Sequence, residues 1–307
     1  MLSTSQKFQP ITPASVKPFV KWAGGKAQIL HNIKTKYPEA LGKTVMKYAE
    51  PFVGGGAVLF DILSNYKLSE VYISDTNREL IHAYTTIRDS CDALILQLKV
   101  IENEYIPAGY EKRKEIYYCT RNRFNMLKQS NDDSPELAAQ FIFLNRTCFN
   151  GLYRVNSKGE FNVPQGRYKN PRICDEDNLI AVSERLRNAF IECKDYKESD
   201  VFIDEKTLVY FDPPYRPLTN SSSFAAYTQD GFGDKKQIEL ARFIDMVSER
   251  GAYVIASNSD PKNANEDDCF FDELYSKHKI SRISANRAIN SVGDGRSKIN
   301  ELLITNH

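Results

Sequence analysis

The sequence is poor in cysteine and histidine and has no long apolar run. It contains 6 cysteines, 4 histidines and a single tryptophan in 307 residues. The cysteines form no Cys-x-x-Cys pair and stand apart from the histidines, which argues against a zinc site and against a disulfide framework. Free, scattered thiols are typical of a reducing compartment. Because the chain also lacks a signal peptide and a run of the ~18 apolar residues that a membrane helix needs, we expect a cytoplasmic protein without a metal or a membrane partner.

The chain also lacks an excess of either charge. Lys and Arg number 41 and Asp and Glu number 40, a formal net charge of +1. This balance excludes a uniformly basic, histone-like protein, so a nucleic-acid partner would have to be held by local basic patches. Hydrophobic residues make up 41% and charged residues 26%, as in ordinary globular proteins. The length suggests two domains or one large one.

Strands and helices alternate near both ends of the chain but not in the middle. Residues 46–90 follow the pattern strand, turn, helix, strand, and strand-like segments return after residue 188 around the helical segment KKQIELARFIDMVSER. Such alternation predicts a mostly parallel α/β sheet. Residues 91–188 contain long polar helical stretches and a hairpin near 153–164. We therefore predict a discontinuous α/β domain (1–90 and 189–307) interrupted by a mostly helical inserted domain (91–188).

The segment YAEPFVGGGAVLF (48–60) runs from a strand through glycines into a helix. Such a turn lets the backbone approach a ligand closely and directs helix N–H groups at it. Asp75 ends the next strand, where a carboxylate can accept hydrogen bonds from ribose hydroxyls. The pattern favours a nucleoside ligand, with an ordinary tight turn as the alternative. Leu59 stands where a dinucleotide fingerprint has its third glycine, which weakens the case for NAD.

FVKWAGGK (19–26) is a second candidate segment. It ends in Gly-Gly-Lys but lacks the Ser/Thr and the glycine spacing of a phosphate-binding loop. The single tryptophan lies here beside two lysines and two glycines, which suits a cleft, although a purely structural tryptophan is the alternative.

The sharpest motif is DPPY (212–215), which stops the apolar strand TLVYF. Its two prolines fix φ and remove two N–H donors, leaving a stiff turn with a carboxylate, unpaired carbonyls and an aromatic ring. These groups suit a planar base with an exocyclic amine. Tyr215 can stack on the base while Asp212 and the Pro213 carbonyl accept the amino hydrogens, which makes the nitrogen nucleophilic. The alternative is a proline-rich turn with an incidental tyrosine.

Residues 146–172 form a local basic segment. Six Lys or Arg residues and four aromatic residues accompany one acid, Glu160, which is typical of a phosphate-binding face. An arginine there can pair bidentately with guanine. A solvated charged loop is the alternative. Residues 277–298 repeat the bias, with six Lys or Arg against Asp294.

Taken in order, FVKWAGGK, EPFVGGGAVLF and DPPY resemble the methyltransferases that act on adenine N6 in DNA. The segments NRTCFNGLYRVNSKGEFNVPQGRY and DPPYRPLTNSSSFAAYT resemble the Dam family (D12 class, alpha-type motif order), whose target is GATC. The resemblance spans most of residues 17–306. It implies a Rossmann-like methyltransferase sheet with an inserted target-recognition domain, S-adenosylmethionine as cofactor, double-stranded DNA as partner, a flipped-out adenine and a bacterial or phage origin.

The resemblance also assigns roles to individual residues. Asp212, Pro213 and Tyr215 match the catalytic corner. The expected cofactor-binding residues are Trp22, Lys26, Gly54, Asp75, Asp195, Tyr196 and Asp212. Arg154 matches the side chain that reads guanine, and Phe149 replaces an intercalating tyrosine. Together with the basic segment, this gives the expected DNA contacts: Lys21, Arg146, Phe149, Asn150, Leu152, Arg154, Pro164 and Arg167.

Other functions remain open at this point. Methylation of cytosine N4 is the alternative most similar in chemistry, although relatives with that activity usually carry Ser in place of Asp212. An NAD-dependent oxidoreductase leaves DPPY and the basic insertion unexplained, and a DNA-binding module with a vestigial site would not need every motif residue. A restriction endonuclease acting on the same site is a possible partner, and the oligomeric state stays open. The Ser- and Gly-rich stretch after Tyr215 is expected to be a mobile cover for the site.

Overall fold

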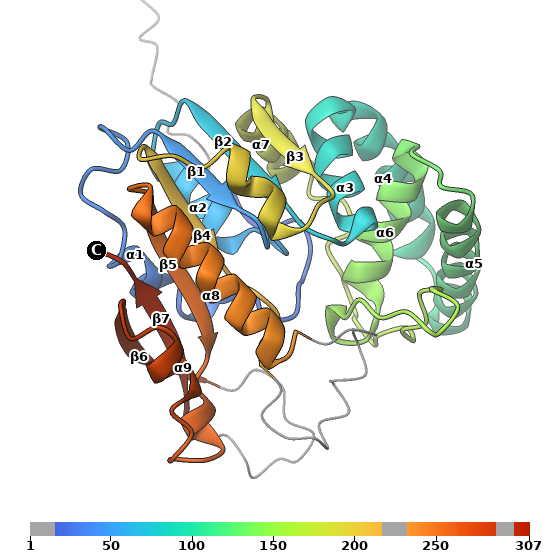
Figure 1. The fold of residues 1–307 in the computed structure, drawn as a ribbon. Helices are drawn as coiled ribbons and strands as arrows, with labels where there is room; N and C mark the ends of the chain where they lie inside the picture. The colour runs from blue at the N-terminus through green and yellow to red at the C-terminus, as the bar shows by residue number, and fades with distance from the viewer. Residues whose placement is uncertain (1–15, 217–231, 287–297) are drawn as a thin grey trace, which may run out of the picture.

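The computed structural model describes residues 16–216, 232–286 and 298–307, and their centre is a seven-stranded sheet (Figure 1). The strands are β1 (Lys47–Glu50), β2 (Glu70–Ser74), β3 (Ala189–Glu192), β4 (Thr207–Phe211), β5 (Tyr253–Ser259), β6 (Lys279–Asn286) and β7 (Lys298–Thr305). Their spatial order is β3-β2-β1-β4-β5-β7-β6. Neighbouring strands pair in parallel except where β7 pairs with β5 and β6. The predicted mostly parallel, Rossmann-like α/β fold is confirmed.

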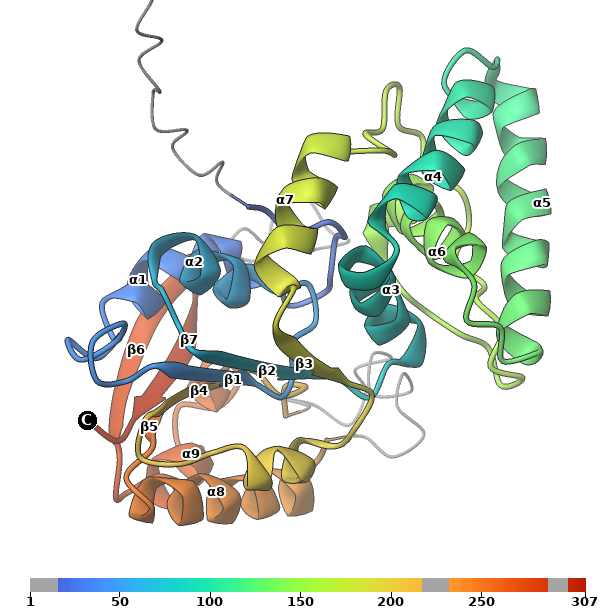
Figure 2. The ribbon, with the colours of Figure 1, turned by 90° about the horizontal axis from the view of Figure 1, so that it is seen from above.

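Helices cover both faces of the sheet, as Figure 2 shows. One face packs against α8 (Asp234–Glu249), α9 (Phe270–Leu274) and the 3-10 helix η3 (Tyr196–Val201). The other packs against α1 (Leu30–Lys34), α2 (Ala57–Asn65), α3 (Arg78–Asp89) and α7 (Glu176–Leu186). β4 shows why both layers are needed, because every residue of TLVYF is buried and such a strand must be covered on both sides.

Three helices stand beside the sheet and not on it: α4 (Cys91–Tyr105), α5 (Tyr110–Gln129) and α6 (Pro135–Thr147) (Figure 2). α6 is buried almost all round because it packs against α3, α4 and α5. Its start follows from sequence: Ser134 caps the helix by accepting from the Leu137 N–H, and Pro135 occupies the first turn. α6 thereby attaches the helical part to α3.

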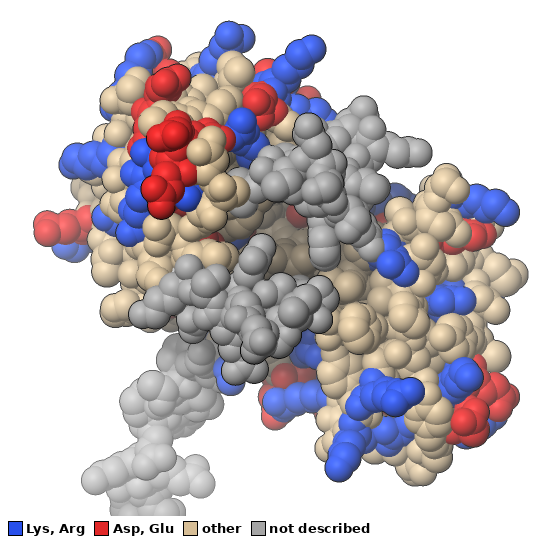
Figure 3. All heavy atoms as spheres, turned by 90° about the horizontal axis from the view of Figure 1, so that it is seen from below, with Lys and Arg blue, Asp and Glu red and all other residues tan. Residues whose placement is uncertain are grey.

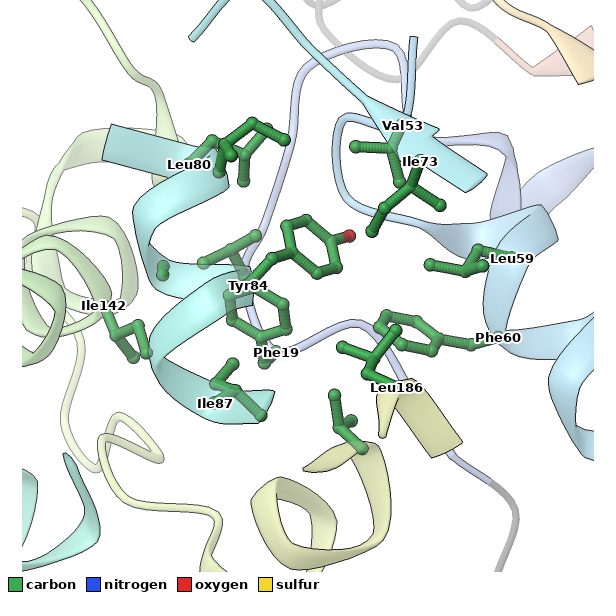
Figure 4. Close-up of a cluster of buried hydrophobic side chains, with 14 of the residues drawn as sticks. Phe19, Val53, Leu59, Phe60, Ile73, Leu80, Tyr84, Ile87, Ile142 and Leu186 are labelled. Atoms are coloured by element: carbon green, nitrogen blue, oxygen red, sulfur yellow. The ribbon is translucent and has the colours of Figure 1, made fainter. Parts of the chain in front are cut away.

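The predicted hairpin follows α6 as a short bridged loop. Val155 and Phe161 form an antiparallel bridge, and the Asn162 N–H donates to the Arg154 carbonyl at 3.1 Å. α7, which ends the segment predicted to be inserted, packs on α3 and buries Leu186 near Phe60 (Figure 4). The division at residues 90 and 188 itself stays a prediction.

The same buried cluster shapes the glycine turn between β1 and α2. Gly54 and Gly56 have φ of +47° and +71°, values that a side chain disfavours. Figure 4 shows Tyr84 at the centre of the cluster, and its hydroxyl donates to the Gly54 carbonyl at 3.1 Å. A Cβ on Gly56 would lie 2.5 Å from the Tyr84 hydroxyl oxygen, so only glycine fits there. The turn is therefore held by the core beneath it.

In the described ranges, no helix is both long enough and apolar enough to cross a bilayer.

Candidate active site

The predicted motifs meet at one edge of the sheet, where β1, β2 and β4 end. The strand order reverses between β1 and β4, and the carboxyl ends of strands at such a switch point form the crevice in which α/β proteins bind ligands. Glu50, Asp75 and Asp212 stand at the ends of these three strands. The 3-10 helix η1 (Lys26–Gln28) brings a lysine to the same place.

Asp212 is held by two donors. Lys26 Nζ lies 2.7 Å from Asp212 Oδ1, and the Ser257 hydroxyl donates to the same oxygen at 2.9 Å. The lysine side chain is only 4% exposed, and its ammonium also donates to the Gly24 carbonyl at 2.6 Å. Both Asp212 contacts fall on Oδ1, so Oδ2 is the oxygen that can receive a ligand hydrogen without displacing either donor.

Tyr215 covers this ion pair. Its ring centre lies 4.8 Å from Lys26 Nζ, and its hydroxyl donates to Glu301 Oε2 on β7 at 2.7 Å. Burial, Asp212 and Glu301 all raise the pKa of Tyr215, so the hydroxyl stays protonated and acts as a donor. The Gln237 amide donates to the Pro214 carbonyl at 3.1 Å and holds the proline turn in place.

Asp75, Gly54 and Trp22 form the neighbouring surface. Asp75 accepts from the Gly54 N–H at 3.1 Å and from the Asn77 N–H at 2.9 Å. Burial raises the pKa of Asp75, while these backbone donors oppose that rise. The half-buried Trp22 packs on the turn so closely that a Cβ on Gly54 would lie 2.8 Å from Trp22 Cδ1. The tryptophan and the glycine turn thus make one continuous wall.

The two remaining cofactor candidates lie on η3. Asp195 is exposed and caps this helix by accepting from the Lys197 N–H. Tyr196 is buried and stacks on Phe52 with ring centres 5.3 Å apart, and Phe232 meets Phe52 edge-on at 5.8 Å. Because Phe52 follows β1, the aromatic cluster adjoins the glycine turn.

The predicted DNA contacts gather around the hairpin and residue 21. Lys21 is exposed, with Nζ 4.1 Å from the centre of the Tyr168 ring. The buried Asn145 joins this lysine to the hairpin segment: it accepts from the Lys21 N–H at 2.8 Å and donates to the Lys21 and Gly151 carbonyls. Sequence analysis missed Asn145, because nothing in NRTCFNG marks an asparagine that bridges to residue 21.

The other predicted DNA contacts, in and beside the hairpin, divide by exposure. Phe149 is 52% exposed although aromatic, and its N–H donates to the Pro164 carbonyl at 2.9 Å. Arg154 is half-buried, and its Nε donates to Asn162 Oδ1 at 2.6 Å. Leu152 is half-buried, while Asn150, Pro164 and Arg167 are exposed. Figure 3 shows a hollow between the sheet and helical parts of the molecule, with Lys and Arg side chains spread over the helical side.

Comparison with known proteins decides between the functions left open. Residues 22–289 match the model of the D12 class N6 adenine-specific DNA methyltransferases. The chain belongs to this family. It is 50% identical to the type II methyltransferase M.MjaIII of Methanocaldococcus jannaschii over 295 residues, covering 95% of this chain and 99% of that protein. It is 35% identical to M1.LlaDCHI of Lactococcus lactis (95% and 96% covered) and 35% identical to the DNA adenine methylase of Escherichia coli K12 (93% of each covered).

As an N6 adenine-specific DNA methyltransferase, the protein acts on DNA, and methyltransferases of this kind generally use S-adenosylmethionine. The predicted family and enzyme class are confirmed, and the oxidoreductase and the vestigial binding module are rejected. Within the ranges that the structure describes, no group of three or more His, Cys, Asp or Glu side chains is arranged around a metal position. Most of the stretch expected to cover the site (217–231) lies outside the described residues, as do 287–297 of the second basic segment.

Glu50 is another site residue of this methyltransferase that sequence analysis did not single out. It is 2% exposed, and the Tyr48 hydroxyl donates to Glu50 Oε2 at 2.6 Å. Burial is the main cause that raises the pKa of Glu50 to about 8, and the nearby Asp212 carboxylate adds to it. A signal was available, because Glu50-Pro51 and Asp212-Pro213 repeat one pattern, an acid followed by a proline where a strand ends.

Arg146 has a structural role in addition to the DNA contact predicted for it. Its guanidinium donates to the Phe19 carbonyl at 3.0 Å and to the Pro18 carbonyl at 3.4 Å, and burial lowers its pKa. These bonds tie α6 to the segment that leads into Trp22. A contact from Arg146 to DNA stays a prediction.

Proposed function

We propose that this DNA methyltransferase transfers the methyl group of S-adenosylmethionine to N6 of a flipped-out adenine in the duplex sequence GATC. The observation that carries the proposal is the ion pair between the buried Lys26 and the half-buried Asp212. The pair lies at the end of β4, next to the glycine turn whose Gly54 N–H donates to Asp75. The site proposed for the methyl donor and the carboxylate that would polarise the amine therefore lie in one crevice.

The residues around the crevice fit the cofactor. Asp75 retains lone pairs for ribose hydroxyls after accepting its two backbone N–H groups, and the Trp22–Gly54 wall leaves no room for a side chain where a ligand would contact backbone. The Phe52–Tyr196 cluster offers an aromatic surface to the adenine ring of the cofactor, and the exposed Asp195 lies at the edge of this cluster. Lys26 supplies positive charge for the carboxylate of the methionine portion. When bound, S-adenosylmethionine supplies a methyl group on a positively charged sulfur.

The catalytic work falls to the proline corner. Asp212 Oδ2 and the Pro213 carbonyl accept the two amino hydrogens of the adenine, which localises the lone pair on N6. Lys26 and Ser257 hold the opposite oxygen of Asp212 so that the carboxylate keeps its orientation. Tyr215, fixed by Glu301, stacks on the base. After transfer the nitrogen carries an extra proton, and Asp212 is the group in position to receive it. The catalysis is positioning plus electrostatics, without a covalent enzyme intermediate.

The target amine is inaccessible inside a duplex, so the adenine must leave the stack at a cost of a few kcal/mol. Phe149 lies in the short 3-10 helix Phe149–Gly151 just before the hairpin, and its ring is half exposed. It suits the role of a wedge, because such a ring has surface available for stacking on bases. The inserted segment 91–188 would thus act as the target-recognition domain, with Arg154, Leu152, Pro164 and Lys21 as base-pair contacts.

Methyl transfer to defined duplexes tests the proposal. Radiolabelled S-adenosylmethionine and a GATC duplex should yield N6-methyladenine on nucleoside mass analysis, and duplexes with one base of the site changed should be methylated far more slowly. Labelled N4-methylcytosine would overturn the assignment of the base. Equal rates on all the duplexes would overturn the target sequence but leave the chemistry intact.

Replacing Arg154 with alanine tests how the sequence is read. A bidentate arginine–guanine contact is worth about 1–3 kcal/mol, so Arg154→Ala should lower kcat/KM on GATC by roughly 5- to 150-fold and narrow the gap between GATC and duplexes changed at the guanine. Lys158→Ala is the matched control, because this exposed lysine sits at the tip of the same hairpin. It should weaken binding to all duplexes alike. If Arg154→Ala behaves like Lys158→Ala, Arg154 contacts only phosphate.

Two of the relatives named above are type II methyltransferases. By this similarity we also propose a companion restriction endonuclease that cleaves the same unmethylated site.

A further inference from the structure

Tyr153 lies where the predicted cofactor site and the base-reading hairpin touch. It directly precedes Arg154, yet its ring stacks on Trp22 with centres 6.0 Å apart and planes inclined by 25°. Trp22 in turn packs on the glycine turn, 2.8 Å from where a Gly54 Cβ would stand. The stacking of Tyr153 on Trp22 therefore connects the hairpin directly to the wall of the crevice.

The Tyr153 hydroxyl makes a second link, to the helix that follows Asp75. It donates to Glu79 Oε2 at 2.7 Å in the first turn of α3, and it accepts from Lys128 Nζ on α5 at 2.8 Å. Lys128 Nζ also lies 3.3 Å from Glu79 Oε1, and Glu79 is 5% exposed. Burial and the Glu79 carboxylate raise the pKa of Tyr153, which keeps the hydroxyl protonated as the donor of this triad.

The hairpin is tied to the same helix as Lys128. The Asn125 side chain on α5 accepts from the Phe161 N–H at 2.8 Å and donates to the Phe161 carbonyl at 3.1 Å. The Gln129 amide reaches Glu160 at 3.3 Å. If Tyr153 moves, the hairpin and α5 are therefore expected to move with it. The position of Tyr153 depends in turn on Trp22, which contacts its ring, and on α3, which accepts a hydrogen bond from its hydroxyl.

We propose that Tyr153 is a positioning residue that couples occupancy of the S-adenosylmethionine site to placement of the base-reading hairpin. The packing supports this, because Trp22 lies between the glycine turn and the Tyr153 ring, so a shift of Trp22 away from the turn moves it against that ring. Coupling between two sites is reciprocal, so DNA should tighten cofactor binding by the factor by which the cofactor tightens DNA binding. This inference rests on the proposed function, since it needs both sites.

Binding measurements on the full chain test the coupling without turnover. S-adenosylhomocysteine is titrated calorimetrically with and without a GATC duplex, and the emission of Trp22, the single tryptophan of the chain, follows the same titrations. In the wild type the duplex should tighten binding by at least about 5-fold, the lower end of ordinary coupling. Tyr153→Phe keeps the ring stack but removes the hydroxyl links. It should leave the affinity without DNA within about 3-fold of wild type and reduce the coupling to below about 2-fold.

Tyr118→Phe is the matched control, a half-buried tyrosine on α5 that contacts Tyr117 and Arg121 outside this triad. It should keep the wild-type coupling. The inference is overturned if Tyr153→Phe also keeps it, or if wild type binds S-adenosylhomocysteine equally well with and without the duplex. A wild-type protein that does not bind S-adenosylhomocysteine at all would instead refute the proposed function, and the inference with it.

Discussion

Replacing Asp212 with asparagine is expected to slow methyl transfer by about 10³-fold, since the loss of one preorganised electrostatic group in an active site commonly costs 10²–10³ and here the polarising group and the proton acceptor are the same. The amide is nearly isosteric, but it is neutral and presents a donor at one of its ends. It can neither pair with the Lys26 ammonium as a carboxylate does nor take up the proton from the methylated nitrogen. Single-turnover transfer at saturating S-adenosylmethionine and duplex measures this step directly.

The same substitution leaves a buried ammonium without its partner, so the effect on folding must be separated from the effect on chemistry. Breaking a fully buried pair costs about 3–5 kcal/mol, which is an upper limit here because the Asp212 side chain is 19% exposed. Asp212→Asn combined with Lys26→Met removes both charges and should recover part of that stability without recovering transfer. Asp204→Asn is the matched control, because Asp204 pairs with Lys47 at 2.9 Å at the opposite end of the same two strands, β4 and β1. It should leave the transfer rate unchanged. Turnover by Asp212→Asn within 10-fold of wild type would show that Asp212 does not polarise the amine.

The fold class and the core of the site could be predicted because both are local in sequence. TLVYF is mostly apolar and DPPY stops it, so the strand, the turn and the groups of the proline turn are all contained in nine consecutive residues. The Gly-rich turn and Asp75 are likewise set by neighbouring segments. The order of the strands was not readable, because it depends on which buried faces pack together and not on any one segment.

Contacts between distant segments explain what was missed. Asn145 meets Lys21 across 124 residues, and Tyr153 meets Glu79 across 74. An asparagine in a helix and a tyrosine in a loop are usually expected at the surface. The packing of α6 against α3 buries Asn145 and half-buries Tyr153, and the sequence around these residues does not indicate that packing. Glu50 was overlooked for a related reason: a glutamate is almost never fully buried, so a burial of 98% could not be expected from its type.

Glu50 should make the stability of this methyltransferase fall as pH rises. The pKa of its carboxyl is about 8 in the folded protein and 4.5 in the reference state that represents the unfolded chain. Between these values the folded state binds more protons than the unfolded state, so the free energy of unfolding decreases with increasing pH. The slope reaches at most about 1.4 kcal/mol per pH unit. Below the lower value both states are protonated, and above the upper value both are ionised, so the contribution of Glu50 is then constant with pH.

Glu50→Gln isolates this contribution, because the amide keeps an oxygen that can accept from the Tyr48 hydroxyl but cannot ionise. Urea unfolding at pH 5, 6, 7, 8 and 9 should show the variant gaining on wild type by a growing margin that levels off above about pH 8, reaching several kcal/mol. Glu39→Gln, a substitution at an exposed glutamate, should follow the wild-type curve at every pH. A constant difference between Glu50→Gln and wild type across this range would mean that Glu50 is already ionised in the folded protein at pH 5. Asp212 and Glu50 would then both be negatively charged, and both would depend on the single positive charge of Lys26.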